Sequence, residues 1–203
     1  MTYTYFTYRN NINTSDSFLL TNPYIAEHLK KITNPNYKSQ SESAYTLLGL
    51  ILSDHFELNI NHLKMSENKY GKPNFTDTEV FFNISHCDDA ILCSVSDYEI
   101  GVDVEKIAKI KDNILRKLFT EYERSQISSP EDFYKLWTLK ESFGKFCGKG
   151  LSLIKDTEFT IKPQIKLETQ INGYNPIFET RIIDNYVVSI TSADTKNNIF
   201  IIK

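Results

Sequence analysis

The stretch Tyr98-Glu99-Ile100-Gly101-Val102-Asp103-Val104-Glu105 places two carboxylates on a short strand-like run, separated by one apolar residue. In an extended chain, side chains two residues apart share a face and lie about 6 to 7 Å apart along the strand. Asp103 and Glu105 therefore share one face with Gly101, while the two valines point to the other. The missing side chain at Gly101 leaves room on the acidic face for a ligand to approach the backbone.

Two carboxylates held this close together raise each other's pKa unless a cation lies between them. A hard divalent ion such as Mg²⁺ prefers oxygen ligands, and it commonly uses one or two carboxylates together with water and substrate phosphate. The alternative is an edge strand whose acidic face is simply solvated. A lone Asp-x-Glu pattern favours that simpler interpretation, so the metal hypothesis needs a second motif.

That second motif lies in a predicted helix that begins after Ser129. Ser129 is a good N-cap, Pro130 suits the first helical position, and Gly148 and Gly150 end the helix. Glu141 and Lys145 lie one turn apart on a common face, with Trp137 one turn earlier. The pair is either an exposed i,i+4 ion pair or part of a partly buried functional face. The apolar residues at helical spacing form a buried stripe: Phe133, Leu136, Leu139, Phe143 and Phe146.

Together, Gly101 to Glu105 and Trp137 to Lys145 resemble the signature of 4'-phosphopantetheinyl transferases of the Sfp (surfactin-synthetase-activating) type. That signature is G-[VI]-D-[VI]-E followed by W-[ST]-x-K-E-[SA]-x-x-K, and this chain matches it without a departure. The similarity extends from about Tyr70 to about Phe159, and it includes segments at Tyr70 to Pro73, Phe82 to His86 and Gly148 to Leu153. It implies Mg²⁺-dependent transfer of 4'-phosphopantetheine from coenzyme A to a serine of an apo acyl or peptidyl carrier protein, with release of 3',5'-ADP.

The resemblance also implies roles for individual residues. Mg²⁺ would be held by Asp103, Glu105 and Glu141. Coenzyme A would be bound by Lys72, Pro73, Ser85, His86, Lys145 and Lys149. Catalysis would involve Glu141, Lys145 and Glu123, the last because Phe119 to Glu123 resembles a third, shorter family motif. The acceptor of the serine proton stays open among Glu141, Glu123 and a water on the cation.

One segment departs from the family. In relatives, basic residues before the second helix meet the 3'-phosphate of coenzyme A, whereas this chain has Lys38 and then Ser43, Ala44 and Tyr45 where an arginine is expected. The sequence therefore does not predict how the N-terminal half binds that phosphate.

For the fold, the resemblance implies an α+β architecture of two similar α/β halves related by a pseudo-twofold axis, with the active site between them. We place the N-terminal half at residues 1–98 and the half that carries the metal-binding carboxylates at 99–203. Helices are predicted near residues 15–32 and 41–56. Runs of strand-forming residues beyond Lys155 predict a sheet that backs the Glu141 helix.

Composition restricts the class of protein. With 203 residues and 40% hydrophobic content, the chain has enough apolar residues to form a core. The formal net charge of -3 argues against nucleic-acid binding, and the sequence has neither an apolar run of about 20 residues nor the layout of a signal peptide. We expect a cytoplasmic monomer without a membrane segment. The three cysteines predict neither a disulfide framework nor a zinc site.

The segment from Lys106 to Leu118 alternates apolar and basic residues. It is either a solvated helix face or a docking surface for an acidic carrier protein. Two other functions remain open at this point: a Mg²⁺-dependent hydrolase of coenzyme A-like pyrophosphates, and a non-catalytic module that binds carrier proteins. Mass analysis of an apo carrier incubated with coenzyme A would separate a transferase from the hydrolase, and loss of activity in Asp103→Ala with carrier binding preserved would count against the module.

Overall fold

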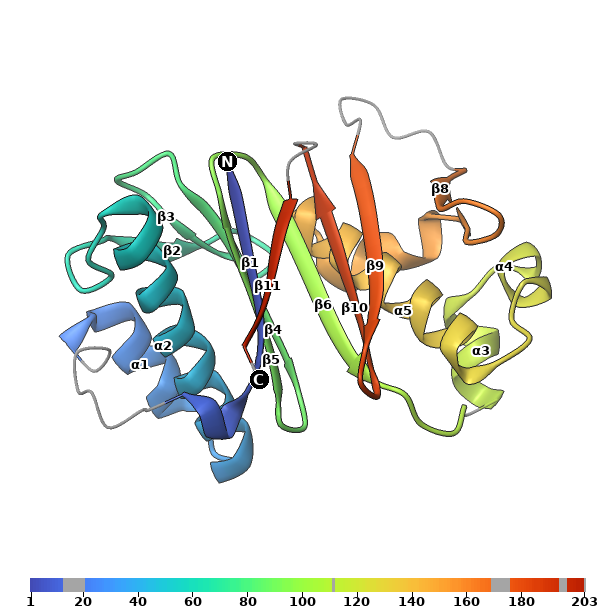
Figure 1. Cartoon of the computed structure of the whole chain (residues 1–203), viewed down its shortest axis with the longest axis horizontal. Coiled ribbons are helices and arrows are strands. Elements are labelled where there is room, and N and C mark those ends of the chain that lie inside the picture. The colour runs from blue at the N-terminus through green and yellow to red at the C-terminus, as the bar shows by residue number, and fades with distance from the viewer. Residues whose placement is uncertain (13–20, 111, 169–175, 194–196, 203) are drawn as a thin grey trace.

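The computed structural model describes residues 1–12, 21–110, 112–168, 176–193 and 197–202. Two β-sheets form the middle of the molecule, with helices outside each of them (Figure 1). The first sheet has the strand order β11-β1-β5-β4, and the second has the order β6-β10-β9. The mixed α+β class expected from the sequence is confirmed, whereas the pseudo-twofold axis stays a prediction.

The first sheet comprises β1 (Thr2–Tyr8), β4 (Phe81–Cys87), β5 (Ala90–Ser96) and β11 (Asn197–Ile202). β1 pairs antiparallel with β5 and parallel with β11. The C-terminal strand thus belongs to the sheet of the N-terminal half, across the division expected at residue 98. The short η1 turn (Arg9–Asn11) follows β1.

The second sheet comprises β6 (Ile100–Lys106), β9 (Ile177–Ile183) and β10 (Tyr186–Ser192), all antiparallel. Two small two-stranded sheets flank the main ones: β2 (Met65–Glu67) with β3 (Pro73–Phe75), and β7 (Phe159–Thr160) with β8 (Lys166–Leu167). Of the strand-forming runs beyond Lys155, the one at 165–169 forms a strand only at Lys166–Leu167, and its last position lies outside the described residues.

Two helices cover the first sheet. α1 (Pro23–Lys31) and α2 (Pro35–Phe56) are each capped by an asparagine, Asn22 and Asn34, with a proline at the first helical position. α2 begins six residues before its predicted start, because the Asn34-Pro35 cap precedes the apolar pattern. The part of the first predicted helix at residues 15–20 lies outside the described residues.

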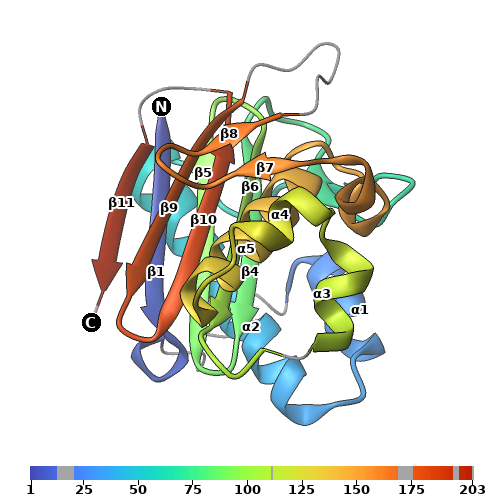
Figure 2. The same cartoon turned by 90° about the vertical axis from the view of Figure 1, so that its right-hand side faces the viewer.

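The second sheet is covered by α5 (Pro130–Phe146), and Figure 2 shows this helix in front of β6 and β10. Ser129 accepts a hydrogen bond from Asp132 N, which confirms the predicted cap. Beyond it lie α3 (Asp112–Leu118), α4 (Glu121–Ser125) and η3 (Gly150–Asp156). The predicted packing of the C-terminal strands behind the Glu141 helix is confirmed for β9 and β10, which form the sheet beneath α5.

The core has three parts, which follow these layers. One cluster lies between α1, α2 and the first sheet, a second lies between the two sheets, and a third packs around α5. Ile100, Val102 and Val104 belong to the cluster between the sheets. The acidic face of β6 therefore turns away from that cluster and toward α5, which positions the site.

Candidate active site

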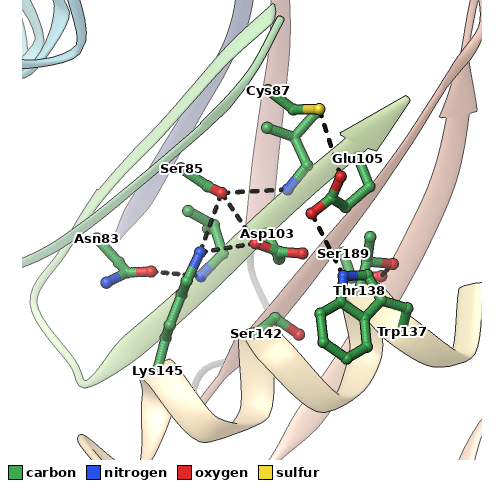
Figure 3. A network of polar contacts seen from close by, with 12 residues as sticks. Asn83, Ser85, Cys87, Asp103, Glu105, Trp137, Thr138, Ser142, Lys145 and Ser189 are labelled. Carbon is green, nitrogen blue, oxygen red and sulfur yellow. Dashed lines mark hydrogen bonds and ion pairs between the residues drawn. The ribbon is translucent and has the colours of Figure 1, made fainter. Parts of the chain in front are cut away.

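The two sheets meet at β4 and β6. Here side chains of β4 form hydrogen bonds to the backbone of β6. Asn83 Oδ1 accepts a hydrogen bond from Val102 N at 2.8 Å, and Ser85 Oγ accepts one from Val104 N at 3.4 Å (Figure 3). Because residues 83 and 85 are two apart on a strand, both point to the same side. These bonds fix the β6 backbone on either side of Asp103.

Asp103 lies at the centre of the site and is 4% exposed. Its Oδ1 accepts hydrogen bonds from Lys145 Nζ at 2.7 Å and from Ser85 Oγ at 2.9 Å. Lys145 also donates to Ser85 at 3.0 Å. Asp103 Oδ2 is buried and has no hydrogen-bond partner. A buried carboxylate oxygen without a donor is costly, so this atom is available to a bound cation.

Glu105, two residues further along β6, is held by two donors. Cys87 Sγ donates to Oε2 and Trp137 Nε1 donates to Oε1, each at 3.3 Å. Burial raises the pKa of the Glu105 carboxyl, and the nearby Asp103 charge raises it further. Burial and the charge of Glu105 raise the pKa of the Cys87 thiol to about 12, so the thiol is protonated at neutral pH.

Glu141 faces the same group from α5. Burial raises its pKa to about 7, and Asp103 adds to the shift. The structure therefore brings the three expected metal ligands into one electrostatic cluster. Among the described residues, however, no three His, Cys, Asp or Glu side chains are already arranged as a metal centre. The contacts of Lys145 with Asp103 and of Trp137 with Glu105 would have to adjust when an ion binds.

A cavity of about 390 Å³ opens onto this cluster. Its acidic wall consists of Asp103, Glu105 and Glu141. Four residues expected to bind coenzyme A also line it: Pro73, Ser85, His86 and Lys145. The opposite wall comes from α1 and α2 and is made of His28, Tyr37, Ser41 and Tyr45. The last three are four residues apart on one helix face, a spacing in the sequence that predicts a shared surface.

His86 is neutral in the protein itself. Burial lowers the pKa of its imidazole to about 4, and the Lys145 charge acts in the same direction. Its ring lies edge-on to Tyr37, with centroids 4.9 Å apart, and its Nε2 is 3.4 Å from Ser41 Oγ. An opposite charge favours the protonated imidazole, so a charged His86 would have to be induced by a bound diphosphate.

Two other expected coenzyme A contacts lie further away. Lys72 does not line this cavity; its Nζ is 2.8 Å from Glu99 Oε2 and 3.2 Å from the Ile100 carbonyl. It lines a second cavity of about 260 Å³, which shares Pro73 with the first. Lys149 is exposed in the turn after α5 and lines neither of these cavities.

Glu123 is not brought into the site. It is fully buried, and both of its oxygens accept a hydrogen bond from Lys140 Nζ, at 2.8 and 2.7 Å. Thr120 N and Phe159 N donate to the same carboxylate, and Lys140 also donates to the Thr157 carbonyl. With every oxygen occupied in the interior, Glu123 is placed as a structural anchor of α5, and its role as a base gains no support from this position.

Gly101 corrects one expectation. A Cβ at this position would lie 2.0 Å from the Ser142 carbonyl oxygen and 2.3 Å from Phe146 N. The space beside Gly101 is therefore filled by the backbone of α5, and the expected approach of a ligand to this glycine is wrong. Hydroxyl pairs hold the same helix on β10, since Thr138 bonds Ser189 at 2.7 Å and Ser142 bonds Thr191 at 2.9 Å. Glu141 and Lys145 are consequently oriented toward β6.

Sequence reasoning missed Asn83 and Cys87 as parts of the site. Both share a strand face with Ser85, so the period of two residues could have identified them. Within the described residues, no helix is long and apolar enough to cross a bilayer. The fold and the site define an α+β enzyme whose carboxylates and lysine are suited to cation and phosphate chemistry.

Comparisons with known proteins are specific. The profile of the 4'-phosphopantetheinyl transferase superfamily matches residues 99–191. The gsp 4'-phosphopantetheinyl transferase of Aneurinibacillus migulanus is 30% identical over 172 residues, which cover 77% of this chain and 71% of the relative. Sfp of Bacillus subtilis (strain 168) is 36% identical over 55% of each chain, and HetI of Nostoc is 24% identical over 78% of this chain and 73% of HetI.

The chain therefore belongs to the 4'-phosphopantetheinyl transferase family and is of the Sfp type. The family and the transferase activity expected from the two motifs are confirmed. The match spans about half the length of Sfp itself.

Proposed function

We propose that this protein transfers the 4'-phosphopantetheine group of coenzyme A to a serine of an apo carrier protein. The reaction takes place in the cavity bounded by β4, β6 and α5. The observation that carries this proposal is the environment of Asp103. One of its oxygens accepts a hydrogen bond from Lys145, and the other is buried without a partner, at the edge of a cavity large enough for a diphosphate. This arrangement supports a cation and an ammonium group acting on the same ligand.

The residues present fit Mg²⁺. Asp103, Glu105 and Glu141 supply hard oxygen ligands, the class that this ion prefers. Burial raises the pKa of both glutamates and the Asp103 charge raises it further, and a cation would relieve that repulsion. We assign these three carboxylates as the ligands. When bound, the ion would offset the negative charge of the diphosphate oxygens.

The transfer forms one phosphorus–oxygen bond and breaks another. The serine oxygen of the carrier forms a bond to the β-phosphorus of coenzyme A, the bond from that phosphorus to the bridging oxygen of 3',5'-ADP breaks, and the serine proton passes to a base. Most of the catalysis in such a reaction is positioning and charge neutralisation. Lys145 neutralises the phosphates and stabilises the leaving diphosphate oxygen, while Ser85 and His86 orient the non-bridging oxygens.

For the proton acceptor we favour Glu141 over Glu123. Glu141 lines the cavity, whereas Glu123 is buried outside it with both oxygens bound to Lys140. A base must lie within hydrogen-bond reach of the proton that it removes.

We assign Lys72, Pro73 and Lys149 to the outer part of the coenzyme A donor, where the turn after β2 meets the turn after α5.

For the carrier protein that accepts the phosphopantetheine group, we propose a docking surface near residues 106–118. The carrier that docks there would be acidic. Arg116 and Lys117 are exposed in α3, and Lys109 is exposed before it. Opposite charges on two partners accelerate encounter and set orientation. The two halves, 1–98 and 99–203, would then act together as a monomer.

The direct test is the intact mass of several apo carrier proteins after incubation with coenzyme A, with and without Mg²⁺. We expect one phosphopantetheine added per carrier, only with the cation. Release of free phosphopantetheine without carrier modification would indicate a hydrolase instead. Binding of a carrier with no mass change for any acceptor would indicate a non-catalytic module.

A further inference from the structure

A single side chain connects the turn that carries Lys72 with the turn that follows α5. Asn68 Nδ2 donates to the Gly148 carbonyl at 2.8 Å, across 80 residues of sequence. Its Oδ1 accepts hydrogen bonds from Tyr70 N at 2.8 Å and Lys72 N at 3.0 Å. Because the amide oxygen meets two donors and the amide nitrogen meets an acceptor, its orientation is fully determined.

The turn held by Asn68 is tightly organised. Its backbone closes through Asn68 N to the Lys72 carbonyl and Gly71 N to the Asn68 carbonyl, both at 3.0 Å. Gly71 has φ of +85°, a conformation that suits glycine. Lys72, at the end of the turn, is directed toward Glu99 and the Ile100 carbonyl at the start of β6.

The other end of the contact lies close to the reacting groups. Gly148 N donates to the Lys145 carbonyl at 3.1 Å, so the Gly148 turn directly continues the last turn of α5. Gly148 has φ of +63°, and a Cβ there would lie 2.7 Å from Asn68 Nδ2. The close approach of Asn68 thus uses the absence of a side chain at Gly148.

We propose that Asn68 is a positioning residue that sets the distance between Lys72 and Lys145, and with it the fit of the two ends of the donor. The inference rests on the proposed function, in which both lysines contact coenzyme A. Among the described hydrogen bonds, Asn68 has none to Asp103, Glu105 or Glu141, so it would act by holding the Lys72 turn to the end of α5. Both turns line the same cavity of about 260 Å³.

Two substitutions separate the bond from Asn68 to Gly148 from the bonds that Asn68 accepts within its own turn. Asn68→Asp keeps acceptors for Tyr70 N and Lys72 N, but it loses the donor to Gly148 and places an oxygen against that carbonyl. Asn68→Ala loses both sets of bonds. We expect amide exchange at Tyr70 and Lys72 to stay slow in the aspartate variant and to become faster in the alanine variant.

In both variants we expect the dissociation constant and the KM for coenzyme A to rise about three- to tenfold, with kcat changed less than twofold. The matched control is Asn59→Ala, because Asn59 caps a similar local turn through Asn61 N, and none of its hydrogen bonds among the described residues reaches the other half. That variant should keep the parent affinity. Unfolding midpoints would show whether a change reflects global stability.

Two outcomes would overturn the inference in different ways. If the parent binds coenzyme A and both Asn68 variants bind it equally well, Asn68 does not position the donor site, and the proposed function stands. If only Asn68→Ala loses affinity, the local turn matters and the link to Gly148 does not. A parent that fails to bind coenzyme A would remove the proposed function itself.

Discussion

Lys145 Nζ and Asp103 Oδ1 are 2.7 Å apart and join α5 to β6 at the point where the two sheets meet. The lysine forms an ion pair with the buried carboxylate, and it lines the cavity beside Ser85. In the proposed reaction this ammonium group moves its interaction from Asp103 to the diphosphate. The contact therefore links α5 to β6 in the protein without coenzyme A, and the diphosphate would replace Asp103 as the partner of Lys145 when the donor binds.

Removal of this charge should affect turnover. We expect Lys145→Met to lower kcat/KM for coenzyme A about 10²-fold or more, since one preorganised donor to a transition-state charge has an effect of that size. The measurement is steady-state transfer to a carrier protein. Lys166→Met is the control, because Lys166 is exposed and pairs only with Glu168 among the described contacts. Equal rates in the two variants would contradict the role of Lys145.

The buried pair of Glu123 and Lys140 predicts a different result. We expect Glu123→Gln to lower the free energy of unfolding by about 3 to 5 kcal/mol, because it leaves the Lys140 charge buried without a counter-ion. Urea denaturation measures this change. Glu121→Gln, on the exposed side of the same helix, should stay within about 0.5 kcal/mol of the parent.

A further variant of this pair separates structure from chemistry. Glu123→Leu combined with Lys140→Met removes both charges and should recover most of the lost stability. If Glu123 were the catalytic base, Glu123→Gln would instead abolish transfer while the protein kept its parent stability. That outcome would restore the base assignment that its placement does not support.

Gly101 predicts a packing effect. Gly101→Ala would force a methyl group into the Ser142 carbonyl and Phe146 N, which are backbone atoms that cannot rotate away. We expect a loss of about 3 kcal/mol or more, measured by denaturation, together with lost transfer activity as α5 moves from β6. Gly150→Ala meets open space and should lose only about 1 to 2 kcal/mol for its positive φ of 53°. Similar losses in both would contradict close packing as the reason for Gly101.

The proposed carrier surface predicts an effect on one substrate only. Arg116→Glu combined with Lys117→Glu should raise the KM for an acidic carrier, with a smaller effect at high salt, and should leave the KM for coenzyme A unchanged. Arg181→Glu combined with Lys166→Glu makes the same charge change on β9 and β8. If both pairs raise the carrier KM equally, the effect comes from net charge and not from docking at α3.

The sequence predicted local features well where one segment contains all the information. The Ser129 cap, the shared face of Asp103 and Glu105, and the common face of Glu141 and Lys145 all follow from the periods of helices and strands. The two family motifs then indicated that these faces meet. Only the resemblance indicated that the acidic face of β6 and the Glu141 face of α5 lie together, because local periodicity does not predict contacts between residues about 40 positions apart.

What the sequence did not predict depends on long-range packing. Nothing in the Asn197–Ile202 segment indicates that it joins β1 rather than the C-terminal sheet. The contact of Gly101 with α5 and the burial of Glu123 depend on how closely α5 approaches its neighbours. The bonds of Asn83 and Ser85 to the β6 backbone require two strands from different sheets to lie side by side.

The most direct measurement is calorimetric titration of Mg²⁺ into protein saturated with coenzyme A, for the parent and for Asp103→Asn. We predict one Mg²⁺ per parent molecule and an affinity at least about tenfold weaker in the variant, which keeps the shape of the side chain and loses the charge. Asp97→Asn, at the exposed contact with the N-terminus, should bind Mg²⁺ like the parent. Equal Mg²⁺ affinity in the parent and Asp103→Asn would contradict the assignment of the buried carboxylate as a metal ligand.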